Sequence, residues 1–439
     1  MALRAGNTTR SWPDLLLIAA FVAAIYLPIA EGILQLDRTT APEEKRSLAR
    51  FPQVTLSATC LAGLPPKLEA WYDDHFGFRN RLIRAHNWAK VMWLHASPSL
   101  KVVVGRDGFY YLADEETAAQ SELASDQLLR QWQQALEEKR DWLAAKGIAF
   151  LVVIAPDKQS IYPEKLPRAV AGQLLSVRTE QFVRHMAAHS QVEVVDPRRP
   201  LLEAKKESPV YYRTDTHWTA FGSYVVYREI MARLSEQLAE VKPLSLSEFD
   251  RLAKMLPGGD LATMLGVEDA VREERTWLIR RRPPGTPELR LPNPEPPPGT
   301  GAAIRVGEQP VADLPRLVMF HDSFGLRLMR FLSEHFSRSV YVEARDVKRL
   351  TVEWEQPDVV ILEVCERYLA RRDAFTSNPA MQQDLEAWQA GKRPRRESGS
   401  SAALRRALPP TRLGVRAEGH AAGSVPLGPG RGRASTLSR

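Results

Sequence analysis

The sequence predicts an α/β protein, built on a parallel central sheet with helices on both faces and preceded by one apolar N-terminal helix. Short, continuous apolar runs alternate with segments of helical periodicity through most of the 439 residues. Hydrophobic residues make up 44% of the chain, enough for a substantial core. The longest uncharged apolar stretch stands near the N-terminus, apart from this alternation.

The N-terminal segment has the composition of a membrane anchor. Arg4 and Arg10 precede the uncharged stretch 15–30, LLLIAAFVAAIYLPIA. This stretch is slightly shorter than the ~20 residues of a typical spanning helix, and the apolar residues that follow it can extend it. A cleaved signal peptide shares these features, but Pro28 is not the small residue that a cleavage site needs. The sequence therefore favours an uncleaved signal anchor over residues 1–36, with the positive end cytoplasmic and the rest exported.

Two smaller units are expected before the main α/β pattern. Residues 37–100 are polar and then amphipathic, which predicts a helical lead-in rather than an independent domain. Residues 101–112, KVVVGRDGFYYL, predict a β-hairpin with its turn at Arg106-Asp107-Gly108.

The main domain is expected over residues 101–390, where helical and strand patterns alternate. The expected elements are helix 127–146, strand 148–156, helix 172–189, strand 192–197, helix 219–239, strand 314–320, helix 324–336, strand 339–344 and strand 358–364. The first of these strands, IAFLVVIAP, is continuously apolar, as a strand buried on both faces should be. Residues 282–300 are too rich in proline for either element and predict a long surface loop.

The basic charge of the chain is concentrated at its C-terminal end. Residues 391–439 hold eleven Lys and Arg against two acidic residues, a net charge of +9 that leaves −2 for residues 1–390 out of the total of +7. This segment is rich in Gly, Pro, Ser and Arg and lacks aromatic residues, which predicts a disordered basic tail rather than a further folded module. Because the folded part is close to neutral, no nucleic-acid partner is expected.

Two separate motifs carry candidate catalytic residues. Residues 211–224, YYRTDTHWTAFGSY, contain Asp215 and His217, just before a predicted helix. Residues 318–332, VMFHDSFGLRLMRFL, place Ser323 where a buried strand gives way to a helix. The C-terminal edge of a parallel sheet is where α/β folds hold their sites. A serine hydroxyl needs a base to take its proton, and an imidazole base needs a carboxylate to fix its tautomer.

Each of these residues also has a structural explanation. Ser323 and Asp215 could simply cap helices, and His217 could be a partly buried histidine in a turn. His321 is an alternative base, but a residue two positions before the nucleophile usually points away from it, so a supporting role is expected. Metal binding is not expected, because no second histidine stands at ligand spacing from His217. Cys60 and Cys365, the only cysteines, form no C-x-x-C motif, and whether they pair stays open.

Taken together, the motifs resemble the alginate O-acetyltransferase group of SGNH-hydrolase-like proteins, over about residues 37–370. Besides the two motifs above, the resemblance rests on DDHFGFRNRLIR (73–84), VVVGRDGFYYL (102–112), PDKQSIYPEKLP (156–167), GGDLATMLG (258–266) and ILEVCERYL (361–369). It implies a three-layer α/β/α fold in which Ser323 is the nucleophile, His217 the base and Asp215 its orienting carboxylate. It implies no cofactor.

The sequence departs from the SGNH pattern at two points. The glycine of the G-D-S block is replaced by His321, and the only asparagines after Asn87 are Asn293 and Asn378, so the oxyanion-binding asparagine is expected to be missing. The Ser323 N–H and another donor would then have to stabilise the oxyanion. Arg213 and Tyr212 are the candidates for that donor, and with Trp218 they are the expected substrate-binding residues.

The resemblance implies an O-acetyltransferase that modifies an exported, alginate-like polysaccharide. Its acetyl group would come from a membrane-bound O-acyltransferase, and the protein would sit in the bacterial inner membrane with its catalytic domain facing the periplasm. Two alternatives stay open. The same triad could serve a polysaccharide acetylesterase or deacetylase, or the chain could be an inactive polysaccharide-binding component of an export complex.

Overall fold

The computed structural model describes residues 12–34, 48–55, 57–174, 176–238, 241–282, 303–309, 311 and 313–390. The predicted disordered tail, nearly all of the predicted proline-rich loop and the N-terminal arginines lie outside the described residues.

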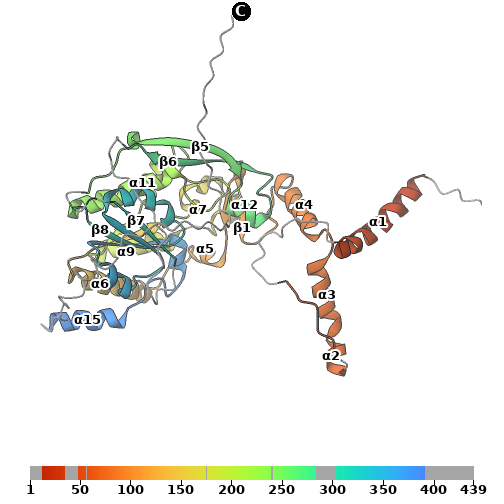
Figure 1. Cartoon of the computed structure of the whole chain (residues 1–439), viewed down its shortest axis with the longest axis horizontal. Helices are drawn as coiled ribbons and strands as arrows, with labels where there is room; N and C mark the ends of the chain where they lie inside the picture. The colour runs from red at the N-terminus through yellow and green to blue at the C-terminus, as the bar shows by residue number, and fades with distance from the viewer. Residues whose placement is uncertain are drawn as a thin grey trace, which may run out of the picture.

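The core of the protein is a six-stranded sheet in the order β4-β3-β10-β8-β9-β7 (Figure 1). Its strands are β3 Ala149–Ala155, β4 Glu193–Val195, β7 Ile304–Glu308, β8 Arg316–His321, β9 Arg338–Glu343 and β10 Val359–Cys365. All neighbours are parallel except the edge strand β7, which pairs antiparallel with β9. The predicted parallel central sheet is therefore confirmed for five strands. The sixth strand was missed because the short sequence IRVGE has no extended apolar run.

The helices vary in length, and several are single turns. They are α1 Trp12–Leu34, α2 Ala58–Ala62, α3 Leu64–His75, α4 Arg79–Met92, α5 Glu115–Ala119, α6 Asp126–Ala144, α7 Lys158–Ile161, α8 Arg168–Ala171, α9 Val177–His189, α10 Arg198–Ala204, α11 Ala220–Gln237, α12 Asp260–Leu265, α13 Met329–Leu332, α14 Arg349–Glu355 and α15 Pro379–Gln389.

Two apolar clusters cover the two faces of the sheet. Successive strand residues point to opposite faces, so Leu151 and Val153 join α11 in one cluster while Val152 and Ile154 join α6, α9 and α15 in the other. In Figure 1, α11 lies above the sheet and α6 and α15 lie below it. The three-layer α/β/α arrangement expected from the sequence is confirmed.

Two antiparallel hairpins lie outside the central sheet. Strands β1 Val102–Val104 and β2 Tyr110–Leu112 form the predicted hairpin. Strands β5 Phe249–Pro257 and β6 Arg272–Arg280 form a longer arm that crosses the top of the molecule in Figure 1. The arm was not predicted, because most of its side chains are partly or fully exposed and show no buried apolar face.

The predicted helix 324–336 is wrong in form. The chain instead makes a 3₁₀ turn at Gly325–Arg327, the single turn of α13, and a second 3₁₀ turn at Ser333–His335. Most apolar side chains of this segment are buried, as the helical pattern requires, but Ser333 is buried as well. The Ser333 hydroxyl bonds the hydroxyl of Tyr341 at 2.7 Å, a contact that ties this segment to β9.

The N-terminal apolar helix is present as α1, which extends away from the body of the protein in Figure 1. Residues Trp12–Gly32 are long and apolar enough to cross a membrane: an 18-residue window has a mean hydropathy of 2.1, and 6% of that window is buried. Length and composition alone fit both a membrane anchor and a signal sequence. Near its C-terminal end, the backbone of Pro28 packs closely on Gly77, between α3 and α4.

Candidate active site

Ser323 stands in a tight turn directly after β8, in the middle of the sheet. The buried carboxylate of Asp322 fixes this turn, because it accepts the N–H of Phe324 at 2.9 Å and the N–H of Cys365 at 2.7 Å. Ser323 itself is exposed, while Asp322 and Phe324 are buried. The turn therefore presents the serine hydroxyl to solvent, while the residues on both sides of it are held in the core.

A second buried carboxyl group lies beneath the turn. Glu363 of β10 is completely buried and accepts the N–H of Asp322 at 3.1 Å. Burial, reinforced by the charge of Asp322, raises the pKa of Glu363 well above its ordinary value. A Cβ added at Gly325 would lie within 3.0 Å of both His321 and Glu363, so only glycine fits there. The sequence did not single out Glu363 as a site residue. Its position as the one acidic residue in the apolar run VVILEVC could have indicated a buried carboxyl group with a specific role.

His321 lies in the core, away from the serine hydroxyl. It is 1% exposed, and its Nδ1 donates to the carbonyl of Asp322 at 2.6 Å. Burial lowers the pKa of this imidazole, which favours its neutral form. The only hydrogen-bond partner of its ring within the described part of the chain is this backbone carbonyl, consistent with a supporting role.

The other two candidate catalytic residues form a continuous chain of contacts with Ser323. His217 Nε2 lies 2.8 Å from Ser323 Oγ, although 106 positions separate the two residues. On the other side of the ring, His217 Nδ1 lies 2.8 Å from Asp215 Oδ1, which also accepts the backbone N–H of His217 at 2.9 Å. The structure thus brings together a hydroxyl, an imidazole and a carboxylate in the order that proton transfer from a serine requires.

Asp215 is held ionised by its surroundings. Burial opposes ionisation, but the hydrogen bond and charge of His217 and the charge of Arg275 outweigh it and hold the pKa of Asp215 far below its ordinary range. Arg275 Nη1 lies 2.7 Å from Asp215 Oδ2. Arg275 comes from the β5–β6 arm, and no sequence signal separated it from the other charged residues of that strand.

An aromatic cluster fixes the plane of the imidazole. The ring of His217 lies 4.8 Å from that of Phe324, and Trp218 meets the same phenyl ring edge-on at 4.9 Å. Phe324 and Trp218 are both completely buried. The Trp218 side chain, expected to bind substrate, therefore packs in the core behind His217.

The other two expected substrate-binding residues differ in exposure. Tyr212 is 3% exposed, its hydroxyl bonds the backbone of Thr276 at 3.2 and 3.3 Å, and the guanidinium of Arg275 lies 4.3 Å from its ring centroid. Arg213 is exposed. Of the three residues, only Arg213 presents its polar end to solvent in this conformation.

A buried lysine holds the backbone of the loop 211–219, which carries Asp215 and His217. Lys158 is 2% exposed, and its Nζ donates to the carbonyls of Tyr110 at 2.7 Å and Arg213 at 2.9 Å. Burial lowers the pKa of Lys158 to about 8. Lys158 belongs to the PDKQSIYPEKLP motif, and its contacts give that motif a role in positioning the loop that carries Asp215.

Both cysteines are free thiols. Cys365 is completely buried, and burial raises the pKa of its thiol well above the ordinary value. Its Sγ lies 3.3 Å from Asp157 Oδ1, which also pairs with Arg367. This network lies close to the turn that holds Ser323, since the Arg367 guanidinium is 5.6 Å from the ring centroid of Phe324.

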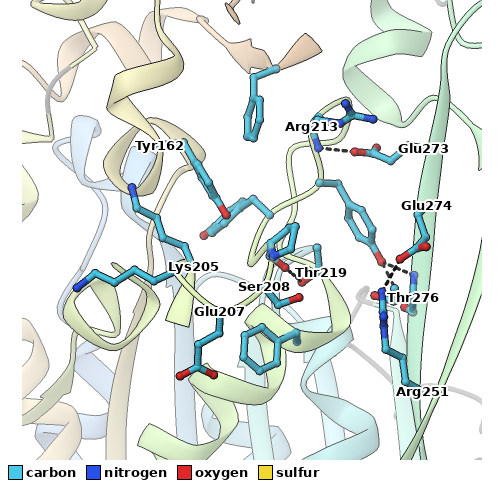
Figure 2. Close-up of a pocket in the computed structure, with 16 residues that line it drawn as sticks. Tyr162, Lys205, Glu207, Ser208, Arg213, Thr219, Arg251, Glu273, Glu274 and Thr276 are labelled. Atoms are coloured by element: carbon cyan, nitrogen blue, oxygen red, sulfur yellow. Dashed lines mark hydrogen bonds and ion pairs between the residues drawn. The ribbon is translucent and has the colours of Figure 1, made fainter. Parts of the chain in front are cut away.

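A cavity of about 510 Å³ lies beside the loop 211–219 (Figure 2). Its walls include Tyr162, Lys205 and Thr219, and none of the three candidate catalytic residues lines it. Figure 2 shows the backbone of Arg213 bonded to Glu273 at its upper edge. The cavity therefore adjoins this loop, but the candidate catalytic groups lie outside it.

One cluster among the described residues has donor atoms close enough to hold a metal ion. Ligand atoms of Asp215, His217 and Asp260 lie within 4.8 Å of one another. Asp215 already pairs with the guanidinium of Arg275, a fixed positive charge that disfavours a second cation there. The arrangement of these side chains therefore suits proton transfer better than metal binding.

Comparisons with known proteins bear on the family that this chain resembles. Residues 102–285 match the family described as "SGNH hydrolase-like domain, acetyltransferase AlgX". Over these residues the chain resembles SGNH-hydrolase-like acetyltransferase domains, and the resemblance found in the sequence is confirmed. Ser323 lies beyond the matched residues.

Curated relatives carry a related name. "Probable alginate O-acetylase AlgJ" of Azotobacter vinelandii is 28% identical over 47% of this chain and 52% of its own length. The protein of the same name from Pseudomonas fluorescens is 30% identical over 43% of this chain and 46% of its own length. The chain spans about half the length of the curated relatives it matches.

Solved structures also align with this chain. The "O-Acetyltransferase Domain of Pseudomonas putida AlgJ" is 20% identical with a TM-score of 0.42, covering 66% of this chain and 99% of that one. Bacillus cereus PatB1 is 13% identical with a TM-score of 0.49, covering 63% of this chain and 99% of that one.

Proposed function

We propose that this protein transfers acetyl groups to hydroxyls of an exported polysaccharide, with Ser323 as the nucleophile. The observation that carries the proposal is the continuous chain of contacts from Ser323 Oγ through His217 to Asp215, both at 2.8 Å. It occurs in a chain with an SGNH-hydrolase-like acetyltransferase domain.

In the first half-reaction, Ser323 Oγ attacks the carbonyl carbon of an acetyl ester or thioester donor. His217 Nε2 takes the hydroxyl proton as the new C–O bond forms, and Asp215 stabilises the resulting imidazolium. When the tetrahedral intermediate collapses, the donor's C–O or C–S bond breaks and His217 returns the proton to the leaving group. The product is an acetyl ester on Ser323.

In the second half-reaction, a sugar hydroxyl attacks the acetyl-serine. His217 takes the proton of that hydroxyl and then gives it to Ser323 Oγ as the ester bond to the enzyme breaks. The negative charge on the carbonyl oxygen needs donors in both steps. The backbone N–H of Ser323 is one candidate and the exposed guanidinium of Arg213 another, whereas the Tyr212 hydroxyl already bonds Thr276.

The substrate and setting follow from the relatives. Because they are named as probable alginate O-acetylases, we propose an alginate-like polysaccharide as acceptor. A membrane-bound O-acyltransferase is the proposed acetyl source. Helix α1 would anchor the chain in the bacterial inner membrane, with the catalytic domain facing the periplasm.

Intact-mass spectrometry after incubation with an acetyl ester donor tests the nucleophile. The protein should gain the mass of one acetyl group, and Ser323→Ala should abolish the gain. Ser121→Ala is the matched control, because the Ser121 hydroxyl bonds the nearby carbonyl of Ala118 at 2.8 Å, in an exposed turn. An adduct of equal yield in Ser323→Ala would refute the assignment.

A polysaccharide acetylesterase is the second candidate, favoured by the exposure of Ser323, which leaves the acetyl-serine open to water. Ester turnover should be measured with and without oligosaccharide. Acetylated oligosaccharide as the main product supports the transferase, and free acetate at an unchanged rate supports the esterase. Oligosaccharide binding without turnover or adduct would instead indicate an inactive binding component.

A further inference from the structure

The segment GGDLATMLG has no part in the mechanism above, yet its first residues lie directly on the catalytic loop. The N–H of Gly259 donates to Thr214 Oγ1 at 2.9 Å. The N–H of Thr216 donates to Asp260 Oδ1 at 2.7 Å. The residues on both sides of Asp215 are therefore hydrogen-bonded to this segment, Thr214 to Gly259 and Thr216 to Asp260.

Gly259 is required by space rather than by backbone conformation. Its φ of −78° is one that any residue adopts. A Cβ at this position would lie 2.7 Å from Asp215 Oδ2 and 2.5 Å from Arg275 Nη2, closer than side chains normally approach. The bare backbone thus packs against the catalytic carboxylate and its ion-pair partner.

Asp260 places a second carboxylate at the imidazole. Its Oδ2 lies 3.6 Å from His217 Nδ1, the nitrogen that Asp215 Oδ1 meets at 2.8 Å. The charged groups around this side of the ring are Asp215, Asp260 and Arg275, with Lys158 buried behind the loop. The side chain of Asp260 is 41% exposed, so its oxygens stay partly hydrated.

We propose that Asp260 is a positioning residue for the candidate triad. One carboxylate oxygen fixes the Thr216 N–H and hence the course of the loop between Asp215 and His217. The other adds negative charge beside Nδ1, which stabilises the imidazolium formed when Ser323 loses its proton. This inference rests on the proposed function, because it concerns the same acyl transfer.

The test separates charge from packing. Asp260→Asn keeps an oxygen for the Thr216 N–H but removes the charge, whereas Asp260→Ala removes both. We expect Asp260→Asn to lower kcat for ester turnover roughly tenfold with KM unchanged, since Asp260 does not touch the substrate. The acid limb of the pH–rate profile should move to lower pH, because the imidazole loses a stabilising negative charge. Asp260→Ala should lower kcat further, because it also removes the hydrogen bond to the Thr216 N–H.

Two matched controls accompany these variants. Asp269→Asn makes the same chemical change at an 83% exposed carboxylate that follows this segment. Gly259→Ala is a further test variant, and Gly258→Ala is its control. Both substitutions place a methyl group where the packing has no room, but the methyl at Gly258 meets Ala262 and Val271 instead of Asp215. Only Gly259→Ala should reduce activity beyond its effect on folding.

A readout that needs no turnover keeps the outcomes distinct. In proton NMR, the His217 Nδ1–H should exchange with water faster in Asp260→Ala than in the parent protein. If both Asp260 variants keep the turnover rate, pH profile and exchange rate of the parent protein, the inference is overturned. The Ser323 adduct, and so the proposed function, would be unaffected by that result. If no adduct forms but exchange still accelerates, Asp260 positions His217 and the proposed acetyl transfer fails.

Discussion

Arg275 links the β5–β6 arm to the carboxylate of Asp215, and replacing it with glutamine should impair both stability and turnover. Its guanidinium lies 2.7 Å from Asp215 Oδ2, and the two side chains are only 13% and 9% exposed. Removing one partner of a buried ion pair typically costs about 3–5 kcal/mol. We expect a value near the lower end, about 3 kcal/mol, because His217 still bonds the carboxylate.

Turnover of an acetyl ester should also fall in Arg275→Gln. Without the guanidinium, Asp215 loses one of the contacts that fix its plane, and a misplacement of about 1 Å can cost roughly 10²-fold in rate. Stability is measured by urea unfolding at pH 7 and below pH 4, and activity by kcat/KM at pH 7. Arg251→Gln, on the same arm but 60% exposed and paired with Glu274 at the surface, should change neither quantity appreciably.

The pH dependence gives a further check on Arg275→Gln. A carboxyl group whose native pKa is depressed contributes stability above its unfolded pKa of about 4, and loses that contribution as the pH falls. The stability gap between parent and variant should therefore be fully present at pH 7 and narrow in acid. Parent-like stability and turnover in Arg275→Gln at pH 7 would contradict the coupling.

Three further predictions concern buried groups around the site. The pKa of Lys158 is lowered to about 8, so between pH 8 and about 10 the unfolded chain binds more protons than the folded protein. In urea unfolding, the stability of the parent protein should therefore rise relative to that of Lys158→Met across that range. Phe324→Ala should cost about 3–5 kcal/mol in the same assay, since it empties a completely buried site against His217. Gly325→Ala should abolish adduct formation in intact-mass spectrometry, because the new methyl group would collide with His321 and displace the nucleophile turn.

The sequence predicted the candidate triad because each member carries a local signal. Ser323 follows an apolar strand, and Asp215 and His217 precede Thr219, which caps α11 by accepting the N–H of Gly222 at 3.0 Å. Strand ends and helix caps can be read from a few neighbouring residues. Their convergence could then be inferred, because such ends gather at one edge of a parallel sheet.

The supporting residues could not be found in this way. Arg275 and Asp260 reach the loop from segments 60 and 44 positions away from their bonding partners there, and neither segment has a periodic pattern that fixes its place. Tyr212 and Trp218 were expected at the substrate because they are near His217 in sequence. Side chains of neighbouring loop residues point in different directions, and both of these are buried in the core.

The distances along the chain between the site residues also bear on how the protein folds. Strand β3 pairs with β10, which follows it by about half the length of the chain, and β8 lies on the other side of β10. Such non-local pairing is slow to form, because the entropy of closing a long loop is lost before the contacts are gained. Helices such as α6 can form early, but Ser323 cannot reach His217 until the two halves of the sheet have joined. Recovery of adduct formation during refolding should therefore lag behind recovery of helical signal, and the contact between Ser323 and His217 would be among the last in the molecule to form.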